Sequence, residues 1–104
     1  MEMERGLIKT FVGYVHYRAM GQGKSIILMH PCAKSSTMFL ELMPILAKKL
    51  RVYAMDTPSY GFSDHFPYQP TIADYGRVVV EFMVGLGLKK GVKRGWFWTV
   101  LNEI

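Results

Sequence analysis

The chain has 104 residues, 50% of them hydrophobic and 20% charged, a composition typical of one globular domain. No stretch reaches the roughly 18 apolar residues of a membrane-spanning helix, and the acidic start at residues 1–5 has no apolar block behind it, so no secretory signal is expected. The single cysteine cannot form an internal disulfide, and with the three histidines it lacks zinc-ligand spacing. We therefore expect a cytoplasmic protein without a membrane span, metal or cofactor.

The net charge of +5 is unevenly distributed along the sequence. Residues 1–88 hold nine basic and seven acidic side chains, whereas residues 89–104 hold four basic and one acidic. A domain that binds phosphate backbones would usually spread its basic residues over a folded face. Nucleic acid is therefore not the expected partner.

The first third of the chain predicts three strands. Leu7–Val12 and Tyr14–Arg18, with Gly13 between them, are typical of a hairpin. Ile26–Met29 is an apolar run without polar alternation, as in parallel strands that are covered on both faces.

A helix and a fourth strand are predicted next. Ser35 and Ser36 offer N-cap oxygens. Behind them one apolar stripe at helical spacing consists of Phe39, Leu42, Met43, Leu46 and Leu50. The run Val52–Met55 follows, so the order strand, helix, strand predicts a right-handed βαβ unit with parallel strands.

The segment from Asp56 to Pro70 is rich in proline and glycine and predicts a loop. Thr71 and Asp74 form a capping-box-like start to a second helix. Its predicted apolar stripe consists of Ile72, Tyr75, Val79, Phe82 and Leu86. The sequence thus predicts an α/β fold with the order β-β-β-α-β-α.

Three segments between residues 12 and 90 resemble the N-terminal part of the α/β-hydrolase fold family. Ile26–His30 followed by Pro31-Cys32 is similar to the third strand and its His-Gly loop, with Pro31 where glycine is usual. Residues 56–64, Asp-Thr-Pro-Ser-Tyr-Gly-Phe-Ser-Asp, resemble the Asp-x-Pro-Gly-x-Gly-x-Ser-Asp loop, with Ser59 replacing the first glycine. Residues 71–88 are similar to the helix that leads to the nucleophile strand. We therefore divide the chain into a partial hydrolase domain at 1–90 and a divergent basic and aromatic tail at 91–104.

This resemblance implies hydrolysis of ester-type or related bonds by an activated nucleophile. Preorganised N–H donors then stabilise the developing oxyanion, and one donor comes from the loop after the third strand. Carried onto this sequence, that donor is the backbone N–H of Cys32, and His30 supports the loop. Esterase, lipase-like, epoxide hydrolase and dehalogenase activities all remain open.

The sequence lacks the nucleophile that the resemblance calls for. No Gly-x-Ser-x-Gly motif or near variant follows Leu88, and residues 89–104 contain no serine, cysteine or aspartate. The acid and histidine of a triad are missing with it. We therefore expect an N-terminal fragment that is inactive by itself and meets a small-molecule substrate only when a C-terminal half completes the site.

Other polar residues have structural interpretations. In Ser63-Asp64-His65 neighbouring side chains diverge, so we expect Ser63 and Asp64 to bond nearby backbone rather than to form a triad. Asp56 is expected to hold its loop. Cys32 as a nucleophile would need a base, and His30, two residues away, is poorly placed, so an inert thiol is expected.

The tail leaves three alternatives open. It is a divergent end without a role, a strand at Trp96–Leu101 beside the third predicted strand, or a basic and aromatic binder of nucleic acid or anionic membrane. Without a covering strand, Ile26–Met29 would be an open apolar edge that promotes self-association. The alternative function is accordingly a non-catalytic interaction module that pairs through its open sheet edge.

Overall fold

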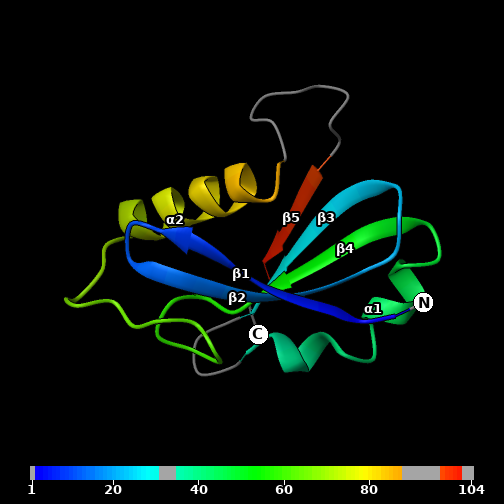
Figure 1. Cartoon of the computed structure of the whole chain (residues 1–104), viewed down its shortest axis with the longest axis horizontal. Coiled ribbons are helices and arrows are strands. Elements are labelled where there is room, and N and C mark those ends of the chain that lie inside the picture. The colour runs from blue at the N-terminus through cyan, green and yellow to red at the C-terminus, as the bar shows by residue number, and fades with distance from the viewer. Residues whose placement is uncertain (1, 31–34, 88–96, 102–104) are drawn as a thin grey trace.

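The computed structural model describes residues 2–30 and 35–87 and the backbone of 97–101 (Figure 1). In chain order the elements are β1 (Glu4–Thr10), β2 (Gly13–Met20), β3 (Lys24–Met29), the 3₁₀ helix η1 (Ser36–Phe39), α1 (Met43–Leu46), β4 (Leu50–Met55), α2 (Ile72–Gly85) and β5 (Phe97–Leu101). The predicted α/β class and the order of elements up to α2 are confirmed.

The described strands form one sheet in the order β1-β2-β4-β3-β5. β1 and β2 are the predicted antiparallel hairpin, and β2 also runs antiparallel to β4. β3 and β4 are parallel, with a register that runs from Lys24 opposite Leu50 to Met29 opposite Met55. The central βαβ unit is therefore confirmed.

Helices cover both faces of this sheet, with α2 on one side and η1 and α1 on the other (Figure 1). Ile27 and Phe82 belong to the core beneath α2, whereas Leu28 and Met43 belong to the core beneath η1 and α1. Because successive side chains of a strand point to opposite faces, β3 contributes side chains to both cores. This is why its sequence shows no polar alternation.

The first helix differs from the prediction. Ser35 caps its start as expected, since its Oγ accepts a hydrogen bond from Thr37 N. The single helix expected up to Leu50 is instead two pieces of four residues each, η1 and α1. Pro44, in the first turn of α1, has no N–H, and within a continuous helix its ring would clash with the carbonyl of Leu40.

The second helix begins as predicted. Thr71 Oγ1 accepts from Asp74 N, and Asp74 Oδ2 accepts from Thr71 N, which makes a complete capping box. Its predicted buried stripe is partly wrong, because Ile72 is 89% exposed and the buried residues are Val78, Phe82 and Met83. The helix thus meets the sheet through its last two turns. No helix in the described ranges is both long and apolar enough to cross a bilayer.

A strand in the tail confirms one of the three alternatives. β5 runs parallel to β3, from Ser25 opposite Phe97 to Met29 opposite Leu101. The edge of β3 that would otherwise be open is therefore covered, and β5 becomes the last strand of the described sheet (Figure 1). Residues 89–96, on which the basic-tail alternative depends, lie outside the described residues, and that alternative stays a prediction.

Candidate active-site edge

The carboxyl ends of β3 and β4 lie side by side, because Met29 is opposite Met55. The chain leaves this edge at His30 and at Asp56, both of which are buried. Nε2 of His30 accepts a hydrogen bond of 2.9 Å from Thr57 N, and the His30 ring stands edge-on to Tyr60 at 5.7 Å. His30 thereby joins the end of β3 to the loop that follows β4.

Asp56 is the most densely bonded carboxylate of this edge. It is fully buried. Its Oδ1 accepts a hydrogen bond of 2.6 Å from Ser36 N. Its Oδ2 accepts hydrogen bonds of 3.1 Å from Phe62 N and 2.8 Å from Nδ1 of His16. Burial acts to raise the pKa of the Asp56 carboxyl, but the hydrogen bonds from Ser36, Phe62 and His16 prevail and lower it below its ordinary value. Asp56 is therefore ionised at neutral pH.

His16 is held from two sides. Its Nδ1 donates to Asp56, and its Nε2 accepts 2.9 Å from Nε of Arg5. A nitrogen that accepts carries no proton, so the imidazole is neutral and protonated on Nδ1. His16 is buried in β2, and it connects the β1–β2 hairpin to the end of β4.

Ser63 and Asp64, two of the three triad residue types in Ser63-Asp64-His65, connect the loop after β4 to β2 by hydrogen bonds. Ser63 Oγ donates a hydrogen bond of 2.6 Å to the carbonyl of Asp56 and accepts one of 2.8 Å from His16 N. Asp64 Oδ2 accepts 2.8 Å from Tyr14 N. The expectation that Ser63 and Asp64 bond backbone rather than form a triad is therefore correct.

Ser59, where the resemblance expects glycine, has a φ of 79°. This left-handed conformation is one that glycine adopts without strain and other residues rarely adopt. Ser59 Oγ accepts a hydrogen bond of 3.0 Å from Phe66 N, and this bond stabilises the serine side chain within the loop. The position thus keeps the backbone shape of a glycine.

The segment 31–34, with the Cys32 donor inferred from the resemblance, lies outside the described residues. The residues on either side of it are fixed: His30 is bonded to Thr57, and Ser36 N is bonded to Asp56. Two consecutive residues at the end of β4 thus anchor the chain before and after this segment. The roles of Cys32 and His30 in supporting an oxyanion stay predictions.

The sequence pattern predicts Asp56 only as a support for its loop and does not indicate a role for His16. An isolated His in Val15-His16-Tyr17 carries no local signal, because the alternating pattern is equally typical of a half-exposed strand. Among the described residues no three His, Cys, Asp or Glu side chains are grouped as metal ligands would be.

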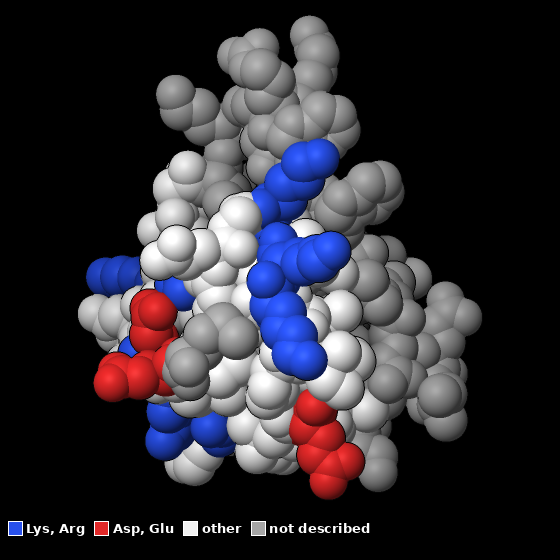
Figure 2. Space-filling model, turned by 90° about the vertical axis from the view of Figure 1, so that its right-hand side faces the viewer, with Lys and Arg blue, Asp and Glu red and all other residues white. Residues whose placement is uncertain are grey.

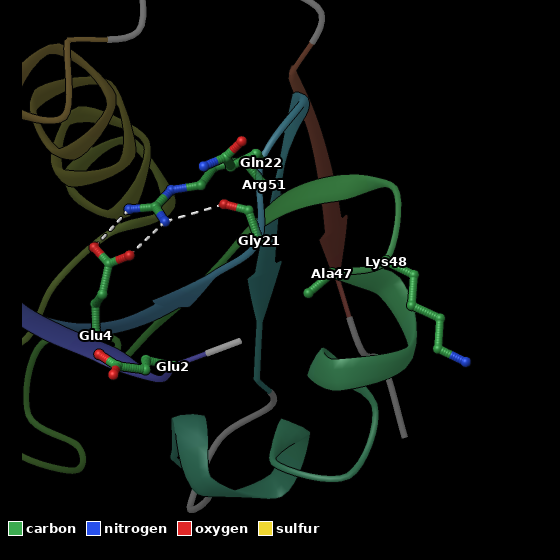
Figure 3. A pocket seen from close by; sticks show the side chains of 7 residues that line it. All are labelled: Glu2, Glu4, Gly21, Gln22, Ala47, Lys48 and Arg51. Carbon is green, nitrogen blue, oxygen red and sulfur yellow. Dashed lines mark hydrogen bonds and ion pairs between the residues drawn. The ribbon is translucent and has the colours of Figure 1, made fainter.

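A hollow of about 600 Å³ lies at the opposite end of the parallel strands, near the start of β4. Its Arg51 donates to both carboxylate oxygens of Glu4 and to the carbonyl of Gly21, while Lys48 points away from it (Figure 3). The hydrogen bonds with Glu4 raise the pKa of Arg51, and Arg51 lowers the pKa of Glu4. The guanidinium is thus already neutralised, which argues against a ligand site here.

The surface on this side carries mixed charge. Lys and Arg side chains form a band across it, and acidic side chains lie beside the band (Figure 2).

The chain is similar to known hydrolases in sequence and in structure. Haloalkane dehalogenase 2 of Mycobacterium bovis is 32% identical over 89 residues, which are 83% of this chain and 30% of that protein. An epoxide hydrolase from Vigna radiata superimposes with a TM-score of 0.85 at 17% identity, covering 98% of this chain and 32% of that structure. A naproxen esterase from Bacillus subtilis gives a TM-score of 0.79 at 26% identity, with 86% and 32% covered. No family model matches the sequence.

The sheet order, the loop after β4 and these similarities together define an α/β-hydrolase fold. The chain has the N-terminal part of this fold. It spans about 30% of the length of the curated relatives it matches.

Proposed function

We propose that this chain supplies the N-terminal portion of a hydrolase active site, with Cys32 N–H as one oxyanion donor. The nucleophile, acid and base come from a separate segment, since the 104 residues contain no Gly-x-Ser-x-Gly motif. The completed site cleaves an ester-type or related bond, with the carbon–halogen bond and the epoxide as the first substrates to test because of the named relatives.

The observation that carries this proposal is the pair of anchors around segment 31–34. A preorganised N–H donor lowers the barrier only when its backbone does not have to reorganise during the reaction. The bonds from Thr57 N to His30 and from Ser36 N to Asp56 fix the residues that flank this segment at the carboxyl end of the sheet. Ligand sites of α/β sheets lie at that end.

The absence of turnover by the chain alone is tested with an activated ester such as p-nitrophenyl acetate. We expect no burst of nitrophenol above the rate given by the same chain unfolded in urea. A burst equal to the protein concentration that a serine-directed inhibitor abolishes would refute this part of the proposal.

Complementation tests the active-site role itself. The chain is co-expressed with the remainder of haloalkane dehalogenase 2 that lies beyond the matched 89 residues, and halide release, epoxide opening and ester cleavage are measured. We expect activity only when both polypeptides are present. A stable complex with none of the three activities would contradict the proposal.

A second candidate function follows from the position of β5 at the end of the described sheet. A terminal strand offers backbone N–H and C=O groups to another chain, so a non-catalytic module that pairs edge to edge is the alternative. Light scattering during size-exclusion chromatography distinguishes the two candidates. Concentration-dependent dimers without activity in the complementation assay favour the module.

A further inference from the structure

Two arginines face each other across the β1–β2 hairpin. Arg5 is the register partner of Arg18. Directly opposed residues of an antiparallel pair project from the same face, with Cβ atoms about 4.5–5.5 Å apart, and like charges in this position repel. In the described part of the chain the ion pairs are His16–Asp56, Arg51–Glu4 and Arg77–Glu81, so no carboxylate there neutralises either arginine.

Each guanidinium is oriented by a neutral acceptor. Arg5 donates from Nε to Nε2 of His16 at 2.9 Å, and Arg18 donates from Nε to Oγ of Ser36 at 3.1 Å. The Cζ of Arg5 also lies 5.1 Å from the centre of the Phe62 ring. These bonds use only Nε, and the hydrogen bonds among the described residues leave the terminal nitrogens of both side chains as available donors.

An open hollow of about 670 Å³ adjoins Arg5 and is lined by Arg5, Gly6, Leu7, His16 and Phe62. Leu7 is 57% exposed and Phe62 is 66% exposed. A cation beside exposed apolar side chains suits a ligand with an anionic head and an apolar body. His16 forms a rigid base for the hollow, since it is buried and bonded to Asp56.

We propose that Arg5 and Arg18 bind a small organic oxyanion, a carboxylate or phosphate carried on an apolar group. The oxyanion lies between the two guanidinium groups, which match its geometry through paired N–H donors. The apolar group packs on Leu7 and Phe62. This site is on the β1–β2 hairpin and is independent of the proposed hydrolytic function.

Calorimetric titration of the full chain with phenyl phosphate tests this site, with benzoate as a second probe and inorganic phosphate as a head-group control. We expect Arg5→Gln and Arg18→Gln each to weaken phenyl phosphate binding at least tenfold, since each substitution removes the charged donor of a charge-assisted hydrogen bond. Arg77→Gln removes the same charge from α2, where Arg77 is paired with Glu81, and is expected to change affinity less than twofold. Leu7→Ser should weaken phenyl phosphate but not inorganic phosphate.

Circular dichroism verifies the fold of each variant. If a glutamine variant unfolds, Arg5→Lys and Arg18→Lys keep the charge and are expected to bind with intermediate affinity, since lysine lacks the planar fork. Equal weakening by Arg5→Gln, Arg18→Gln and Arg77→Gln would reduce the site to general charge attraction and overturn the proposal. Absence of binding by the unaltered chain at millimolar probe would do the same.

Discussion

The carboxylate of Asp56 accepts a hydrogen bond from Nδ1 of His16 at 2.8 Å, although 40 residues separate the two in the sequence. The same carboxylate accepts from the backbone N–H groups of Ser36 and Phe62. One buried charge therefore connects β2, the start of η1 and the loop after β4. Its hydrogen bonds hold these three segments together at this edge of the sheet.

Replacing Asp56 with Asn should lower the free energy of unfolding by about 2–4 kcal/mol. The amide keeps one oxygen acceptor but turns its NH₂ group toward a donor, which leaves a buried N–H without an acceptor. Urea unfolding followed by circular dichroism measures the loss. Glu41→Gln alters an exposed carboxylate and should stay within about 0.5 kcal/mol of the unaltered chain. Equal values for the two variants would contradict the prediction.

Acid should destabilise the chain through the same group. The pKa of Asp56 in the folded protein lies below its ordinary value of 3.8, so on acidification the unfolded chain takes up the proton first. The stabilising contribution is therefore complete above about pH 5 and is lost as the pH falls through 3.8 toward the folded-state pKa. Glu81, whose pKa is lowered mainly by its hydrogen bond with Arg77, adds a smaller effect in the same direction.

Unfolding free energies measured between pH 6 and pH 3 test this linkage. Asp56→Asn should give a shallower dependence on pH than the unaltered chain, because the titrating group has been removed. Parallel curves for the two proteins would show that Asp56 does not carry the acid sensitivity.

Two glycines give predictions of opposite sign. Gly61 has a φ of +55°, and a Cβ there would overlap the carboxyl group of Asp56, so Gly61→Ala should destabilise by about 1–3 kcal/mol. Gly76 lies within α2, and a Cβ there meets no atom within 4 Å. Gly76→Ala should therefore stabilise the chain by about 0.5–1 kcal/mol. Thermal and urea unfolding of the two variants check both signs, and a shared sign would contradict the assigned contacts.

The local sequence pattern was sufficient to predict the strands and the capping box. Strands that are buried on one or both faces show a characteristic order of apolar and polar residues, and the capping box depends on two residues that are close in the sequence. The local pattern was insufficient for the first helix, where the apolar spacing concealed the effect of Pro44. It was also insufficient for His16, which lies beside Asp56 only because Tyr17 of β2 pairs with Met55 of β4. Strand register between distant segments depends on topology, which no window of the sequence contains. The resemblance marked the loop at 56–64 but not the partners of its first residue.

The core beneath α2 should be sensitive to the loss of one aromatic ring. Phe82 is fully buried and stands edge-on to Tyr17 at 5.7 Å. Phe82→Ala should cost about 3–5 kcal/mol, since removing a large buried side chain leaves a cavity, and this loss is a large fraction of the stability of a small domain. Val84→Ala, at a position 61% exposed on the same helix, is the matched control. Near-native circular dichroism and unchanged unfolding of Phe82→Ala would contradict the packing.

Removal of β5 should expose the edge of β3 and promote self-association of the chain. β5 pairs with β3 over five register positions, and β3 is apolar on both faces, with Ile27 and Leu28 buried in opposite cores. Deleting residues 97–104 leaves the backbone groups along that edge of β3 without partners, and such an edge pairs with other chains. We expect the shortened chain to form larger species in size-exclusion chromatography with light scattering, at concentrations where the full chain and a variant lacking only residues 102–104 do not. If the chain without β5 remained a monomer with undiminished stability, the pairing of β5 with β3 would contribute nothing to the fold.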